Sequence, residues 1–161
     1  MIKNSLFLTL LICCFGNYCY AQSKTTNKLL STFESSNATD SIRLAACKQL
    51  TSALAKVDSA KAELYIQKGI AFSQQLADNE SKLFFESQRA LILIGKGHLK
   101  EAEDLIESIV TQAEASGFEQ VQTNCYRILV NYYFSEGNLI KTSEYMEKVL
   151  AVYQSVGKQY Q

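Results

Sequence analysis

Residues 97–117 read GHLKEAEDLIESIVTQAEASG, and residues 137–157 read GNLIKTSEYMEKVLAVYQSVG. The two stretches match at a spacing of 40 residues, which pairs Gly97, Leu99, Ile106, Ile109 and Gly117 with Gly137, Leu139, Met146, Val149 and Gly157. Another 40 residues earlier in the chain, Ala62 and Ile66 stand at the positions equivalent to Ala102 and Ile106. A period of this length is typical of stacked supersecondary units, in which each unit contacts only its neighbours.

The composition around this repeat favours helices. The chain contains no proline, and its apolar residues recur at spacings of three and four without any long strand-like alternation. Polar or glycine-containing breaks separate these runs, at 57–59, 78–79, 95–98, 116–117 and 136–138. We therefore predict an all-α fold of about three antiparallel helical hairpins, over residues 40–79, 80–118 and 119–157, within one domain that spans 40–161.

The ends of the helices carry further signals. Asp40 is predicted to cap the first helix, with Ser41 as the second candidate, and Asp58 or Ser59 to cap its partner. Gly117 can supply the left-handed backbone that closes a helix. Residues 22–39 form a polar leader, flexible at its start and with a short helix over 28–33.

The first 21 residues have the pattern of a secretory signal peptide. Lys3 supplies the positive start, residues 6–15 are an apolar run, and Cys19-Tyr20-Ala21 fits a cleavage site before Gln22. The alternatives are lipidation at Cys13 or Cys14, for which Leu11-Ile12 is a poor match, and an uncleaved anchor. Cleavage predicts an exported protein, periplasmic or secreted.

Charge and hydropathy exclude two classes of partner. Removing the segment with Lys3 leaves 15 basic and 16 acidic side chains, so the net charge is close to −1. A nucleic-acid-binding protein would carry a basic surface, and a lipid-binding one a polybasic patch. No second long apolar run follows residue 21. We predict no nucleic-acid partner and no membrane contact beyond the signal peptide.

The repeat positions resemble the tetratricopeptide repeat (TPR), a helical hairpin with small residues at its eighth and twentieth sites and larger ones at the eleventh, twenty-fourth and twenty-seventh. In the second repeat these sites, with the turn glycine, hold Ala90, Leu93, Gly97, Ala102, Ile106 and Ile109. The third repeat holds Val130, Tyr133, Gly137, Thr142, Met146 and Val149, and the first holds Leu50, Ala53, Val57, Ala62, Ile66 and Gly69. The first repeat is degenerate, because Leu50 replaces a small residue and its turn lacks glycine.

The resemblance covers residues 40–157 and implies an α-solenoid that binds a protein or peptide through its concave face. In that family the second, fifth and ninth sites of each first helix face the ligand. Here the first repeat places Leu44, Cys47 and Thr51 at those sites, and the candidate groove residues of the other two are Phe84, Ser87, Leu91, Asn124, Arg127 and Asn131. Arg127 and Asn131 lie one helical turn apart and could hold a carboxylate or a peptide backbone.

The period of 40 exceeds the usual 34 residues and is similar to repeats at the front of exported bacterial sensor histidine kinases and LuxR-like regulators. The alternative function is therefore a truncated extracytoplasmic sensor region of such a signalling protein. Residues 159–161 align with 119–121, where a further repeat would begin. We expect the apolar side of the last hairpin to be open, and to be covered by self-association or by a partner.

No group of residues suggests catalysis. His98, the single histidine, lies in a turn beside Glu101 and Glu103, and the pairs Glu101/Glu103 and Glu144/Glu147 are predicted to be solvated. Cys47 and Cys125 lack an activating partner and are expected to be small buried groups. We predict no enzymatic activity, no cofactor and no metal site.

Overall fold

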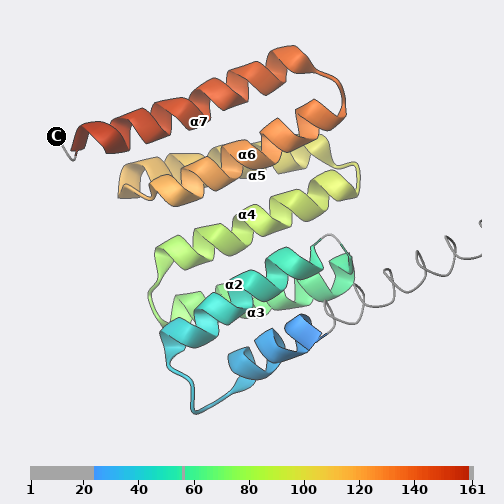
Figure 1. Cartoon of the computed structure of the whole chain (residues 1–161), viewed down its shortest axis with the longest axis vertical. Coiled ribbons are helices and arrows are strands. Elements are labelled where there is room, and N and C mark those ends of the chain that lie inside the picture. The colour runs from blue at the N-terminus through green and yellow to red at the C-terminus, as the bar shows by residue number, and fades with distance from the viewer. Residues whose placement is uncertain (1–23, 56, 160–161) are drawn as a thin grey trace, which may run out of the picture.

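The computed structural model describes residues 24–55 and 57–159, and in this part of the chain every regular element is a helix. The signal peptide predicted over residues 1–21 lies outside the described residues. A helix over residues 24–34 comes first, and it is followed by α2 (Asp40–Leu54), α3 (Ser59–Gln75), α4 (Asn79–Gly95), α5 (Leu99–Ser116), α6 (Glu119–Ser135) and α7 (Leu139–Gln159) (Figure 1). The predicted all-α class is confirmed. The leader differs from expectation, because residues 24–27 are already helical.

Side-chain caps fix most of the helix starts. Asp58 Oδ1 accepts the backbone N–H of Lys61 at 3.0 Å, and Asp78 Oδ1 accepts that of Ser81 at 2.8 Å. The first helix is capped by Thr39, whose Oγ1 accepts from Ile42 N at 3.4 Å. The predicted cap Asp40 is wrong, because it is the first helical residue, where its charge favours the positive end of the helix dipole.

Four of the five turns between α2 and α7 end a helix in the same way. An N–H bonds the carbonyl five residues back in each, from Asp78 to Ser73, His98 to Leu93, Phe118 to Ala113 and Asn138 to Tyr133. This bond needs a left-handed residue just before it, and glycine supplies that residue at 97, 117 and 137, with φ between 69° and 82°. Ala77 takes the same conformation, with φ 54°. The turn after α2 lacks this bond, since Asp58 N bonds Leu54 O, four residues back.

Ala77 therefore marks a strained position that its repeat equivalent, Gly117, does not share. We expect Ala77→Gly to raise the free energy of unfolding by about 1 kcal/mol, because a Cβ is unfavourable at positive φ. Urea unfolding followed by circular dichroism measures the gain. The matched control is Ala115→Gly on the exposed side of α5, which should lose about 1 kcal/mol. A loss of stability in Ala77→Gly would contradict the assignment of strain.

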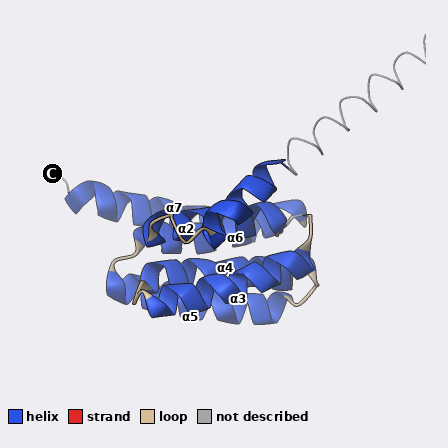
Figure 2. Ribbon diagram, turned by 90° about the horizontal axis from the view of Figure 1, so that it is seen from below, coloured by secondary structure: helices blue, strands red, loops and turns tan. Residues whose placement is uncertain are grey.

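Successive helices run in opposite directions and lie side by side (Figures 1 and 2). Besides its neighbours in the chain, α4 also contacts α2 and α6, so that α2, α4 and α6 form a continuous row. In the described part, α5 and α7 both contact α6, but their Cα atoms do not approach one another within 8 Å. The same holds for α3 and α5, which leaves the even-numbered helices as the centre of the fold.

Two apolar cores hold these helices together. The first joins Phe33, Leu50, Ile66 and Phe85, and the second joins Ala90, Ala102, Ile106, Ile109 and Cys125, among others. Ala62, Ala90 and Ala102 are completely buried, consistent with small residues that let paired helices approach closely. At Gly69 the space of a side chain is taken by the ring of Phe85, which explains why an apolar side chain is missing there in the first repeat.

The helix over residues 24–34 covers the outer side of the first hairpin. Phe33 is buried and stands edge-on to Tyr65 and Phe72, with ring centroids 6.4 and 6.0 Å apart. Arg43 Nε donates to the carbonyl of Phe33 at 3.0 Å. One end of the row of hairpins is therefore closed by the chain's own leader.

Candidate functional site

The six predicted groove residues lie on the central row of helices, Phe84, Ser87 and Leu91 on α4 and the other three on α6. Two of them meet directly, since Asn124 Nδ2 donates to Ser87 Oγ at 2.8 Å. Ser87 Oγ in turn donates to the backbone carbonyl of Phe84 at 2.7 Å. Because Ser87 is completely buried, this chain of hydrogen bonds joins α4 to α6 and does not present Ser87 to a ligand.

Phe84 and Leu91 are half-buried. Phe84 packs against the first core, with its ring edge-on to Phe85 at 5.7 Å and the Lys48 ammonium 5.5 Å from its centroid. Leu91 packs against the second core. Each leaves part of its apolar surface to solvent.

Arg127 and Asn131 are exposed on α6. The Arg127 guanidinium forms no ion pair with a carboxylate of the described residues. The equivalent residues one and two repeats earlier, Ser87 and Cys47, are both completely buried. Among the described helices, α6 is the last of the central row, so the fifth site of its repeat is open.

All three ligand-facing sites predicted for the first repeat are covered. Leu44, Cys47 and Thr51 are all buried in or beside the first core. Of the six predicted groove residues, only Ser87 is therefore buried. Arg127 and Asn131 are exposed, and Phe84, Leu91 and Asn124 are half-buried. Sequence spacing did not reveal this, because it does not say which helix covers which site.

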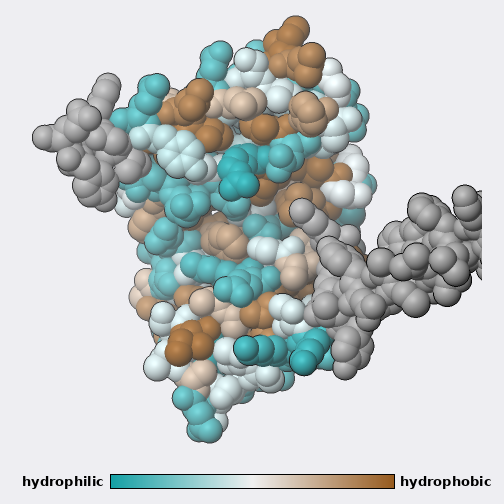
Figure 3. All heavy atoms as spheres, viewed as in Figure 1, coloured by the Kyte–Doolittle hydropathy of each residue, from teal (hydrophilic) through white to brown (hydrophobic). Residues whose placement is uncertain are grey.

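A larger exposed surface lies on α7. Ile106, Val110 and Ala113 of α5 are 2%, 7% and 0% exposed beneath α6, whereas their equivalents Met146, Leu150 and Tyr153 are 52%, 56% and 57% exposed. Leu139 and Ile140 extend this surface at the start of α7, and Phe134 lies exposed at the end of α6. Apolar atoms appear among polar ones over α7 at the top of the molecule in Figure 3. We call Leu139, Met146, Leu150 and Tyr153 the α7 face.

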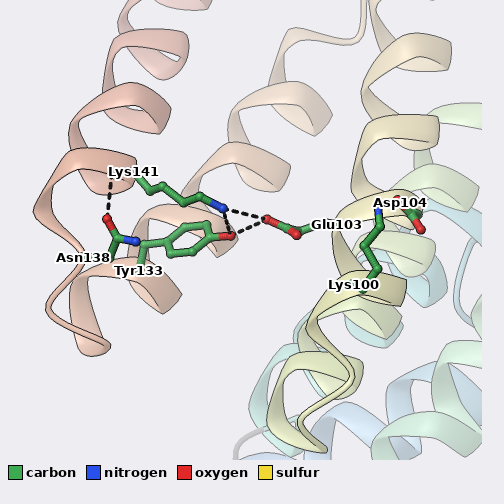
Figure 4. Close-up of polar contacts among 6 residues, drawn as sticks. All are labelled: Lys100, Glu103, Asp104, Tyr133, Asn138 and Lys141. Atoms are coloured by element: carbon green, nitrogen blue, oxygen red, sulfur yellow. Dashed lines mark hydrogen bonds and ion pairs between the residues drawn. The ribbon is translucent and has the colours of Figure 1, made fainter.

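A polar cluster joins α5, α6 and α7 (Figure 4). The Tyr133 hydroxyl donates to Glu103 Oε1 and accepts from Lys141 Nζ at 2.8 Å, and the same ammonium lies 3.7 Å from the carboxylate. Burial, together with the bond to Glu103, raises the pKa of the Tyr133 hydroxyl, so Tyr133 remains a donor at neutral pH. The prediction that Glu103 is solvated is therefore wrong. Its partner lies 30 residues away on another helix, a pairing that no local spacing indicates.

The reactive residue types are held apart or shielded. His98 is exposed and pairs with Glu101 through Nδ1 at 2.9 Å. Cys47 and Cys125 are free and buried, and burial raises the pKa of each thiol to about 12. In the part of the chain that the structure describes, no three histidine, cysteine or acidic residues group as metal ligands would.

No protein-family model, curated protein or solved structure matches the chain. Within residues 24–55 and 57–159, none of the helices combines the length and the hydropathy that crossing a membrane requires.

Proposed function

We propose that this chain is an exported, non-enzymatic TPR-like repeat protein that binds other proteins. Its hairpins form an α-solenoid, with α2, α4 and α6 as the inner row and with α3 and α5 together on one side of it (Figure 2). The contacts of α4 with both α2 and α6, and the lack of direct contact between α3 and α5, support this arrangement. The same backbone turn, repeated at four of the five connections between α2 and α7, supports it as well.

The observation that carries the proposal is the contrast between the α7 face and its equivalent on α5. The apolar surface that α6 covers on α5 has no cover on α7 among the described residues. A monomer that leaves several large apolar side chains open along one helix has a surface suited to protein contact. The apolar residues of the α7 face recur at helical spacing, so the face forms a stripe along which another helix can pack.

We propose a second copy of the chain as the occupant of the α7 face. At the opposite end of the row the 24–34 helix covers part of the first hairpin through the buried Phe33, so a head-to-tail contact would not meet a matching apolar stripe there. Two α7 faces can instead meet about a two-fold axis, which gives a closed dimer. Glutamates 144 and 147 and lysines 141 and 148 mix both signs of charge along α7, so two copies do not repel one another.

Self-association is tested by light scattering and sedimentation over a wide range of concentration. The wild-type chain should form a dimer, and Met146→Glu and Leu150→Glu should each shift it to monomer, because a carboxylate would be buried in the contact. Leu64→Glu is the matched control, since Leu64 is a comparably exposed leucine on α3, and it should leave the dimer unchanged. A wild-type monomer at the highest concentration, or an equal effect of Leu64→Glu, would overturn this assignment. In that case the alternative function is favoured, in which the α7 face contacts a further domain of a longer sensor protein.

The inner row remains the proposed site for a protein or peptide ligand. Arg127 and Asn131 would bind a carboxylate or backbone carbonyl, and Phe84 and Leu91 would contact its apolar side chains. Arg127→Glu should weaken capture of a partner about tenfold or more, while Arg127→Lys should lose less, because it keeps the charge but not the fork of donors. Unchanged capture in a pull-down with Arg127→Glu would exclude this residue as a contact.

A further inference from the structure

A groove runs between α5 and α7, on the side of the protein away from the inner row. Its main part is a cavity of about 390 Å³, with Tyr126 and Leu129 of α6 as floor, Glu103 and Glu107 of α5 as one wall, and Tyr145 and Lys148 of α7 as the other. The hollow exists because α5 and α7 both pack on α6 without packing on each other. A second cavity of about 220 Å³ shares Tyr126 and Lys148 with the first and continues past Glu114.

A cation already lies at the junction of the two cavities. Lys148 Nζ is 5.6 Å from the ring centroid of Tyr126 and 5.0 Å from that of Tyr145. The two rings lie 6.3 Å apart and are tilted by 36°. Both distances are within the range in which an ammonium is attracted to the face of an aromatic ring, so the tyrosines form a two-sided cage for a cation.

The walls of the groove carry more negative than positive charge. Four carboxylates line the two cavities, from Glu103, Asp104, Glu107 and Glu114, against the ammonium groups of Lys100 and Lys148. Glu103 is paired with Lys141, and Asp104 with Lys100 at 2.5 Å. Glu107 and Glu114 have no ion-pair partner within 4 Å among the described residues.

The carboxylates also act on the two tyrosines, although burial is the largest cause of the pKa shift of each hydroxyl. Burial and the nearby Glu114 carboxylate raise the pKa of the Tyr126 hydroxyl. Burial and Glu103 raise that of Tyr145, against the opposing charge of Lys141. A second cation entering the groove would therefore gain from the rings and from carboxylates that no cation neutralises.

We propose that the α5–α7 groove binds a basic peptide segment, in which a lysine ammonium replaces Lys148 between Tyr126 and Tyr145 and pairs with Glu107. The exposed Lys148 side chain is the internal competitor, and its withdrawal joins the two cavities into one channel. This site is separate from the α7 face and from the inner row, so it adds a ligand class to the binding function proposed above.

Simple coverage of Tyr145 by a lysine one helical turn away is the rival explanation. Lys68 lies over Tyr65 on α3 in the same way, with its ammonium 5.0 Å from the ring centroid. That pair supplies the matched control. It has the same residues at the same spacing of three positions, but no second ring is contributed there by a neighbouring helix among the contacts of Lys68.

The test uses the whole chain and a fluorescein-labelled tetralysine peptide, with binding followed by fluorescence anisotropy. We expect Lys148→Ala to bind the peptide about three- to tenfold more tightly than wild type, because the competitor is gone. Glu107→Gln should bind it about threefold or more weakly, and Lys68→Ala should match wild type. The same peptide with acetylated lysines should not bind, because it keeps the shape but loses the charge.

Three results would overturn the proposal. They are equal or weaker binding by Lys148→Ala, binding of the acetylated peptide as tightly as the charged one, and an effect of Lys68→Ala as large as that of Lys148→Ala. Circular dichroism of each variant shows whether the fold is retained, and since all three substituted side chains are exposed on helices, it should be.

Discussion

The Gly69→Ile substitution is expected to lower the free energy of unfolding by about 3 kcal/mol, because it over-packs the first core. Even a Cβ at this position would lie 2.5 Å from Cε1 and Cζ of the Phe85 ring. That ring is completely buried and stands edge-on to Phe84, so it cannot move aside without displacing other core residues. Urea unfolding followed by circular dichroism measures the loss.

The repeat itself supplies the compensating change. Forty residues on, Gly69 and Phe85 correspond to Ile109 and Cys125, both completely buried in the second core, so a large residue and a small one have exchanged places. Phe85→Cys alone should cost about 3–5 kcal/mol through the void it leaves. The double variant, which copies the second core, should be more stable than either single variant.

A glycine without such a neighbour gives the control. Nothing lies within 4 Å of a Cβ built on Gly95 at the end of α4, so Gly95→Ala should be neutral or gain up to about 1 kcal/mol. If the losses of Gly69→Ile and Phe85→Cys simply add in the double variant, the two residues do not compete for one space.

The second prediction is a large difference in stability loss between alanine substitutions at two equivalent positions of the repeat. Ile106→Ala should cost about 2–5 kcal/mol, because Ile106 is buried beneath α6. Met146→Ala should cost less than about 1 kcal/mol in dilute, monomeric protein, because half of its side-chain surface already faces water. Both are measured by urea unfolding at a concentration below self-association.

Whether a second copy covers the α7 face is decided by how the stability loss of Met146→Ala changes with protein concentration. As the protein concentration rises, Met146→Ala should lose stability relative to wild type, because the wild-type dimer is stabilised by mass action and the variant is not. The loss in Ile106→Ala should not depend on concentration to the same degree. Equal losses at the two positions in dilute solution would mean that the α7 face is covered within one chain.

The helices were predictable because their signals are local. Apolar spacing, the Asp58 cap and the glycine at 117 each act within a few residues, and all three were found from sequence. The choice of Thr39 over Asp40 was missed, because it depends on where the first turn of α2 begins. The helical start of the leader at residues 24–27 was also missed, since its composition is polar.

The candidate site was less predictable. Arg127 and Asn131 were found at exposed positions, but Ser87 was expected at a surface and lies buried against Asn124. The contact of Glu103 with Tyr133 and the cage around Lys148 went unseen. Each of these depends on side chains from helices that are neighbours in space and distant in sequence.

The sequence by itself determined the helices, the 40-residue repeat and the apolar character of the last hairpin, because these follow from periodicity and from short-range backbone chemistry. Only the tertiary structure decided which of the repeated positions are covered. Ser87 and Arg127 occupy one site of the repeat, as do Ile106 and Met146, yet one member of each pair is buried and the other exposed. The physical reason is that burial depends on the next helix in the row, so an identical position in the repeat acquires a different role where the described residues supply no such helix.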